Sequence, residues 1–218
     1  MQRVQLPDGR HLEYEVQGPD TGPVVLFHHG MPGSAVPMDS VSRPMTERGY
    51  RVVTFSRAGY GGSDEAPGRS VADSAADGAR LLHHLGVTRY LAAGWSAGGP
   101  HALANAALDP EAVDGVLLVA PFAPRDADGL AYLEGMGAQN IVQFGAVDGG
   151  EAAMRQGVAQ MAAAVGGAPP ADMAAEMAPC CPRPTSRPWP VTTGRRTPST
   201  WTTPWRRGTR AGSPTCEH

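Results

Sequence analysis

A serine stands between glycines in the segment GWSAGG, residues 94–99. The pattern Gly-x-Ser-x-Gly is typical of a nucleophile elbow, a sharp turn from a strand into a helix that exposes a serine hydroxyl for attack on a carbonyl carbon. Glycine is needed at Gly94 and Gly98, because a Cβ at either position would collide with the neighbouring strand or helix. Pro100 falls in the first helical turn, where a missing N–H costs little. These residue types predict Ser96 as a nucleophile.

Two other glycine-containing segments follow expected strands. HHGMPG, residues 28–33, comes directly after the apolar run 24–27, and RAGYGGSD, residues 57–64, comes directly after the run 51–55. The first of them lies where the second N–H donor of an oxyanion hole is expected. The helix after Ser96 directs the partial positive charge of its N-terminus to the same place. A lone Gly-x-Ser-x-Gly match arises by chance in a chain with 28 glycines, but these neighbours make chance a poor explanation.

The elements that must position these segments are strands alternating with helices. Short apolar or alternating runs predict strands at 4–6, 11–16, 24–27, 51–55, 91–93 and 116–119. The first two flank Pro7-Asp8-Gly9 and predict a hairpin. Helical periodicity covers 71–85, with Ser70 as N-cap, and 102–107. The fold class is therefore α/β, with a mainly parallel sheet covered by helices on both faces.

The pattern changes after Pro121. Stretches rich in Ala, Met and Gly predict short helices at 128–137, 151–165 and 171–177, without further strands.

The three segments HHGMPG, SRAGYGGSD and GWSAGG, in this order and spacing, resemble the α/β-hydrolase fold superfamily over residues 1–178. The resemblance implies Ser96 as nucleophile and the backbone N–H groups of Met31 and Ala97 as oxyanion hole. Serine at the elbow disfavours the haloalkane dehalogenase and epoxide hydrolase branches, which carry Asp there. The resemblance therefore implies an esterase, a lipase-like or an iminopeptidase-like serine enzyme that acts on a small ester or amide, with no metal and no organic cofactor.

The same resemblance divides the chain into three parts. Residues 1–125 correspond to the N-terminal part of the hydrolase core, and residues 126–178 to the start of a helical cap that shapes the substrate pocket. Residues 179–218 form an Arg/Pro/Thr-rich tail that we expect to be disordered, and the last strands of the fold are missing.

A serine nucleophile needs a general base, usually a histidine oriented by a carboxylate. The family order is Ser, then Asp or Glu, then His, but His218 is the only histidine that follows the cap. His29 is expected to form structural hydrogen bonds beside the oxyanion loop, and His101 to point away from the serine hydroxyl. His83 and His84 read as a solvated helix end. The base is therefore unassigned.

The acid is also unassigned. Asp64 is most simply a loop cap. Asp126 and Asp128 follow the strand at 116–119, from which some family members supply the triad acid, but an acidic loop before a cap is the commoner explanation. We expect this chain to be catalytically weak or inactive, and a non-catalytic binding protein with the same fold is the alternative.

The tail differs abruptly in composition from the rest. Residues 179–218 hold seven Arg against one acid, with eight Pro, nine Thr and all three Cys, and no Leu, Ile, Phe, Met or Tyr. One explanation is a natural basic extension that binds acidic partners, such as nucleic acid, through its Arg and Trp residues. The other is translation in a shifted reading frame, which fits better because the change cuts into the cap and removes what the fold requires.

Composition limits the remaining function classes. A chain of 218 residues with 41% hydrophobic content and a formal net charge of −3 is expected to fold as a globular protein, with no nucleic-acid or membrane partner. No signal peptide or membrane-spanning run is seen, so a cytoplasmic location is expected. The three Cys have no C-x-x-C spacing and are not expected to bind zinc. The oligomeric state is not predicted.

Overall fold

The computed structural model describes residues 1–166. The chain divides into two units, a first unit of Met1–Glu134 and a second unit that begins at Gly135. The expected helix at 171–177 and the Arg-rich tail from Pro179 lie outside the described residues.

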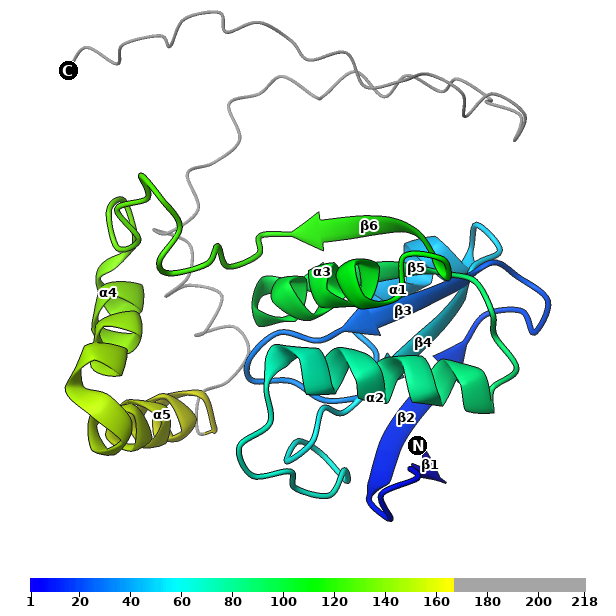
Figure 1. Cartoon of the computed structure of the whole chain (residues 1–218), viewed down its shortest axis with the longest axis horizontal. Coiled ribbons are helices and arrows are strands. Elements are labelled where there is room, and N and C mark those ends of the chain that lie inside the picture. Colours follow the sequence, from blue (N-terminus) through cyan, green and yellow to red (C-terminus); the bar gives the residue numbers. More distant parts are fainter. Residues whose placement is uncertain (167–218) are drawn as a thin grey trace, which may run out of the picture. The chain divides into compact units, whose positions relative to one another are not determined.

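The first unit is built on a six-stranded sheet with the order β1-β2-β4-β3-β5-β6 (Figure 1). A hairpin of β1 (Gln2–Gln5) and β2 (His11–Gln17) joins it antiparallel to β4. The other four strands run parallel and are β3 (Val24–His28), β4 (Arg51–Phe55), β5 (Tyr90–Trp95) and β6 (Val113–Val119). All six expected strands are present, and the α/β fold class is confirmed.

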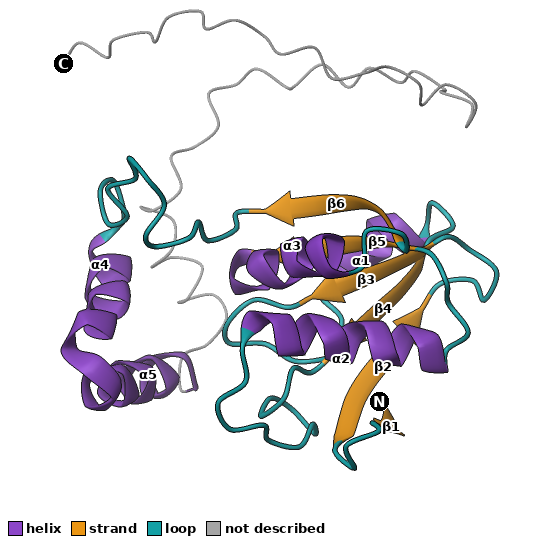
Figure 2. Ribbon diagram, in the orientation of Figure 1, coloured by secondary structure: helices purple, strands orange, loops and turns teal. Residues whose placement is uncertain are grey.

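Helices cover both faces of this sheet (Figure 2). On one face lie α2 (Val71–His84) and α3 (Gly99–Leu108). The predicted N-cap is confirmed, because Ser70 and Asp73 form a capping box at the start of α2. On the other face lies α1 (Asp39–Thr46), which the sequence did not predict, because Pro44 and two serines interrupt its pattern.

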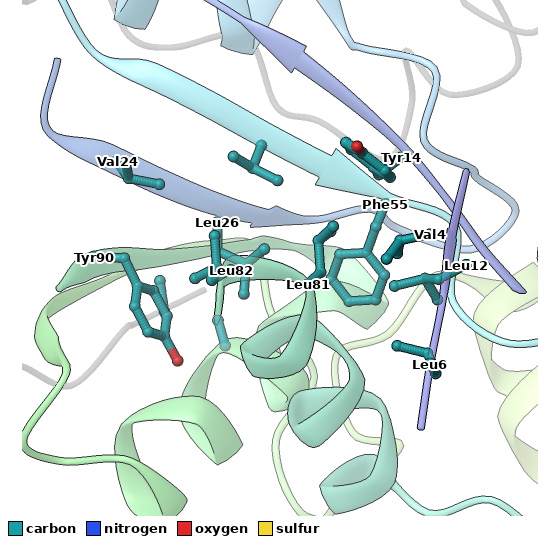
Figure 3. Packing of buried hydrophobic residues seen from close by; sticks show 13 residues of the cluster. Val4, Leu6, Leu12, Tyr14, Val24, Leu26, Phe55, Leu81, Leu82 and Tyr90 are labelled. Atoms are coloured by element: carbon teal, nitrogen blue, oxygen red, sulfur yellow. The ribbon is translucent and has the colours of Figure 1, made fainter. Parts of the chain in front are cut away.

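The core on the α2 and α3 side contains most of the large buried side chains (Figure 3). Leu12, Leu26 and Phe55 from the sheet pack against Leu81 and Leu82 of α2, and all five are essentially inaccessible to solvent. The opposite face is smaller, with Val25, Phe27, Val52 and Ala93 against α1. Burial of these side chains fixes the register of β3, β4 and β5, and with it the edge where their carboxyl ends meet.

The second unit contains α4 (Ala138–Gly145) and α5 (Gly150–Gly166). The helix expected at 151–165 is confirmed as α5. The helix expected at 128–137 is wrong, since this segment is a series of turns, with Gly129 and Gly135 at φ 75° and 77°. Glycine adopts such left-handed values readily and thereby ends helical turns. No helix among residues 1–166 is long and apolar enough to cross a membrane.

Among the strands of residues 1–166, β6 forms one edge of the sheet. Its apolar side chains face both sides, since Val116 is in register with Ala92 and Leu117 with Ala93, which belong to opposite core faces. Val116, Leu117 and Val119 remain 38%, 49% and 41% exposed. A strand that is apolar on both faces is typical of the interior of a parallel sheet, and an exposed one pairs readily with other chains.

We predict that Leu117→Lys reduces self-association of the chain, because a lysine on an exposed edge opposes strand pairing. Sedimentation velocity over a range of protein concentrations measures this. Leu108→Lys is the matched control, since Leu108 is 60% exposed but lies at the end of α3, outside the sheet. A wild-type chain that stays monomeric throughout contradicts the prediction.

Candidate active site

The turn predicted to hold Ser96 is present between β5 and α3. Ser96 follows the last residue of the strand and begins a 3₁₀ turn, Ser96–Gly98, that leads directly into α3. Its φ is 52°, in the left-handed region that a residue with a side chain rarely adopts. Such a conformation costs about 1–3 kcal/mol and persists only where the surrounding structure imposes it. The turn therefore stores strain at the serine.

The glycines around the serine are required by close backbone approaches. A Cβ on Gly98 would overlap the carbonyl of His28 at the end of β3, and a Cβ on Gly94 would overlap the backbone of Gly98. A Cβ on Gly30 would lie 2.9 Å from the ring of Trp95 and 3.5 Å from the Cβ of Ser96. The loop after β3 and the turn after β5 are therefore in contact, as expected for the carboxyl ends of neighbouring parallel strands.

Two backbone donors lie in this contact region. The N–H of Met31 belongs to the loop after β3, and the N–H of Ala97 to the first turn after Ser96. Apart from hydrogen bonds internal to helices and strands, neither N–H donates to a protein acceptor within residues 1–166. Free donors at the start of a helix stabilise negative charge on a ligand oxygen. An oxyanion formed at this edge of the sheet can therefore find hydrogen-bond donors.

His29 forms structural hydrogen bonds in the loop after β3, as expected. Its Nδ1 lies 2.7 Å from the carbonyl oxygen of Gly30, so Nδ1 carries the proton and donates. Its Nε2 then accepts from the backbone N–H of Arg57, at 3.3 Å. The guanidinium of Arg57 donates to the carbonyls of His29, at 2.5 Å, and Gly30, at 3.0 Å. Arg57 belongs to the segment RAGYGGSD noted in the sequence, but no role was predicted for it, because its role depends on a contact between two loops.

Three histidines of this region are buried and neutral. Burial lowers the pKa of His28 to about 3, that of His29 to about 3 and that of His101 to about 4, with nearby positive groups adding to the effect. His28 Nε2 lies 2.7 Å from the Oδ1 of Asn105, inside the core. His101 stacks on the ring of His28 and its Nδ1 faces the carbonyl of Val71. In the described part of the chain, no histidine forms a hydrogen bond with Ser96.

The remaining candidates lie elsewhere. His83 and His84 are exposed at the C-terminal end of α2, as expected. Asp64 accepts from the backbone N–H of His11 at 2.7 Å, which fits the expected loop cap. Asp126 and Asp128 lie in the turns after β6, without a histidine partner among residues 1–166. The structure therefore does not bring a triad acid or base to Ser96 from the residues that it describes. His218 lies outside them.

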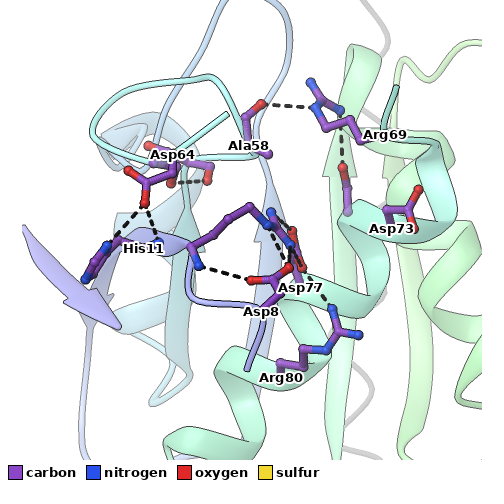
Figure 4. Close-up of polar contacts among 12 residues, drawn as sticks. Asp8, His11, Ala58, Asp64, Arg69, Asp73, Asp77 and Arg80 are labelled. Atoms are coloured by element: carbon purple, nitrogen blue, oxygen red, sulfur yellow. Dashed lines mark hydrogen bonds and ion pairs between the residues drawn. The ribbon is translucent and has the colours of Figure 1, made fainter. Parts of the chain in front are cut away.

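A charged network in the first unit joins the hairpin of β1 and β2 to α2 (Figure 4). Arg10 forms two hydrogen bonds of 2.9 Å with the buried carboxylate of Asp77 and a further ion pair with Asp8. Arg80 also donates to Asp77, at 3.1 Å. These groups line a cavity of about 330 Å³, but they neutralise one another. Among residues 1–166, no three His, Cys, Asp or Glu side chains are grouped to hold a metal ion.

The three buried histidines predict a loss of stability in weak acid. Above about pH 6.5 they are neutral in both states; below it the unfolded chain binds protons that the folded chain cannot, until the pH approaches the folded values. The free energy of unfolding should fall by up to about 4 kcal/mol per pH unit, the sum of three protons. Urea unfolding at a series of pH values measures the slope. His28→Gln keeps an amide opposite Asn105 and should reduce the slope by about one third; an unchanged slope contradicts the assignment.

The close contacts of the elbow glycines predict that alanine destabilises the protein more at Gly98 than at Gly115. Gly98→Ala should lower the free energy of unfolding by about 3 kcal/mol or abolish folding, because the new Cβ meets backbone that cannot move aside. Gly115→Ala in β6 is the control, since its Cβ meets only a side-chain methyl of Leu91 at 3.3 Å. Thermal unfolding of both variants compares them, and equal effects would refute the close approach.

Comparison with known proteins identifies a family for this chain. A family model of the alpha/beta hydrolase fold matches residues 23–150. The chain is 36% identical over 97 residues to a non-heme haloperoxidase of Rhodococcus erythropolis, which covers 44% of this chain and 35% of that protein. It is 35% identical over 97 residues to a bifunctional esterase/perhydrolase of Acinetobacter calcoaceticus, with coverage of 44% and 35%. A putative carbamate hydrolase of Variovorax paradoxus is 30% identical over 141 residues, with coverage of 61% and 53%.

Solved structures show the same architecture. An α/β-hydrolase fold protein from Nakamurella multipartita superimposes with a TM-score of 0.52 at 29% identity, over 65% of this chain and 47% of that one. Cfl2 from Burkholderia cenocepacia superimposes with a TM-score of 0.59 at 23% identity, over 72% and 52%. The chain spans between about a third and half of the length of these curated relatives. Because the family match covers more than half of its residues, this chain belongs to the α/β-hydrolase fold family.

Proposed function

We propose that this chain is a hydrolase of small esters or amides, with Ser96 as nucleophile and the N–H groups of Met31 and Ala97 as oxyanion hole. The observation that carries the proposal is the φ of 52° at Ser96, in a turn whose glycines leave no room for side chains. Strain of this kind is concentrated at functional sites, and a structural turn would place glycine there.

The proposed reaction is acyl transfer through a covalent intermediate. Ser96 Oγ bonds to the substrate carbonyl carbon while its proton passes to a base, and the carbonyl oxygen becomes negatively charged. The N–H groups of Met31 and Ala97 donate to this oxygen, which lowers the energy of the tetrahedral state. The bond to the alcohol or amine then breaks, the leaving group takes a proton, and water releases the acid from Ser96.

The names of the relatives support a substrate with a carbonyl group and do not specify it further. Their names include an esterase/perhydrolase and a putative carbamate hydrolase, whose substrates are an ester and an amide-like group at a carbonyl carbon. A carbonyl substrate suits a site made of a serine and backbone donors, since both act on the carbonyl itself.

The base decides how fast this chain can work. Among residues 1–166 the buried imidazoles are engaged with Asn105, Gly30 and Val71, and none accepts from Ser96. Loss of the base of a serine triad costs on the order of 10⁶ in turnover, and the oxyanion hole and binding alone leave about 10³–10⁴ over water. We therefore propose a hydrolase of low activity, unless the residues beyond Gly166 supply a base.

A second candidate function is a binding protein with the same fold. The observation that favours it is that no base among residues 1–166 accepts a hydrogen bond from Ser96, because a serine without a base is a weak nucleophile. The two candidates differ in whether Ser96 forms a covalent adduct.

We predict that a fluorophosphonate probe labels the full chain slowly at Ser96, and that p-nitrophenyl acetate is hydrolysed at about 10³-fold over the uncatalysed rate. Mass spectrometry of tryptic peptides locates the adduct. Ser96→Ala should abolish the labelling, whereas Ser34→Ala, in the loop after β3, should leave it unchanged. Absence of both labelling and hydrolysis favours the binding protein. Fast hydrolysis that Ser96→Ala abolishes would show that a base outside residues 1–166 acts.

A further inference from the structure

Arg57 is buried, with no carboxylate partner in the described part of the chain. Its side chain follows β4 and is 2% exposed, and within residues 1–166 it forms no ion pair. Burial lowers its pKa to about 10, so the guanidinium is still charged at neutral pH. An arginine buried in this way is costly unless its donors are satisfied by well-placed acceptors. The N–H donors of its guanidinium must therefore have acceptors inside the protein.

The guanidinium of Arg57 donates hydrogen bonds to two successive carbonyl groups of the loop after β3. One guanidinium nitrogen donates to the oxygen of His29 and another to the oxygen of Gly30, at 2.5 and 3.0 Å. The fork geometry of arginine suits this arrangement, since two fixed donors define both distance and direction. The flat face of the guanidinium lies 5.2 Å from the ring centre of Tyr60, which limits its rotation.

The anchored oxygen of Gly30 determines where the N–H of Met31 points. These two groups belong to one peptide unit, and the bond between Gly30 and Met31 is trans. In a planar trans peptide, the C=O and the N–H point in opposite directions. An arginine that holds the oxygen on one side therefore directs the hydrogen of Met31 to the other side.

The same peptide unit lies beside the serine. The Cβ position of Gly30 is 3.5 Å from the Cβ of Ser96, and the ring of Trp95 closes the space next to it. His29 adds a second donor to the oxygen of Gly30 through Nδ1, so this oxygen accepts two hydrogen bonds. A peptide whose oxygen is fixed by two donors, close to the serine residue, has little freedom to rotate.

We propose that Arg57 is a positioning residue, whose guanidinium fixes the peptide of Gly30 and Met31 so that the Met31 N–H is aimed at the oxyanion. The inference rests on the proposed function for its catalytic consequence, but the orientation of the peptide is a property of the chain alone. Within residues 1–166, Arg57 contacts His29, Gly30 and Tyr60, so it acts through the loop.

Arg69 provides a matched control. Its guanidinium also lies over the ring of Tyr60, at 5.8 Å, and its Nε donates to the carbonyl of Ala58, as Figure 4 shows. It donates to Ser74 as well, but to no carbonyl of the loop after β3. Arg69→Met therefore removes an arginine from the same cluster and leaves the peptide of Met31 untouched.

The experiment compares Arg57→Met, Arg57→Lys and Arg69→Met in the full chain. Steady-state hydrolysis of p-nitrophenyl acetate separates kcat from KM, and two-dimensional ¹H–¹⁵N spectra report the amide of Met31. Arg57→Met should lower kcat by about tenfold to a hundredfold with KM changed less than about twofold, because the oxyanion forms only in the transition state. It should also shift the Met31 amide resonance and speed its hydrogen exchange. Arg57→Lys keeps the charge without the forked pair of donors, so its loss of kcat should be smaller. Arg69→Met should change neither kcat nor the Met31 amide resonance.

Each other outcome decides the question. Equal losses in Arg57→Met and Arg69→Met, with an unmoved Met31 amide, reduce Arg57 to a packing role and overturn the inference. If the wild-type chain does not hydrolyse the ester, the proposed function fails, and the Met31 amide alone decides the inference. If Arg57→Met does not fold, Arg57→Lys carries the comparison, and an unmoved Met31 amide in that folded variant overturns the inference.

Discussion

The close approach of the turn after β5 to the end of β3 is the constraint on which the rest of the site depends. Gly98 can lie against the carbonyl of His28 only because it has no side chain. This contact places the 3₁₀ turn over the neighbouring strand and forces Ser96 into its left-handed conformation. It also brings Gly30 next to the serine, so the donors of two separate loops meet at one point. Without it, the strands would still pair, but their loops would not form a common site.

Polar contacts from β4 and its following loop then hold the loop after β3 at both ends. Arg57 holds its beginning through two carbonyls, and the hydroxyl of Thr54 holds the other end by donating to the carbonyl of Ala35, at 2.6 Å. The hydroxyl of Ser56 accepts from the N–H of Ala35 and donates to Glu13 of β2. Hydrophobic burial of the sheet thus sets the approximate place of the loop, and these few directional bonds set its orientation.

Residue types and periodicity were enough to predict the strands, the two long helices of the first unit and the turn at Ser96. Strand alternation, a capping serine and paired glycines are signals within a few consecutive residues, so they can be recognised in a single sequence. The segment 128–137 was mistaken for a helix, because alanine-rich composition does not reveal that Gly129 and Gly135 adopt positive φ. The role of Arg57 was not predicted for a different reason: its partners lie 27 and 28 residues away, and no local pattern indicates such a contact.

Most bonds that orient the site join residues that are far apart in sequence yet early in the chain. The donors and acceptors around the elbow and the loop after β3 run from Glu13 to Asn105, with separations of up to 77 residues. Such long-range contacts form late in the folding of a unit, because each must first close a large loop. During synthesis from the N-terminus, they become possible as soon as α3 has emerged, before α4 and α5 emerge. The nascent chain can therefore organise the surroundings of Ser96 ahead of its own C-terminal half.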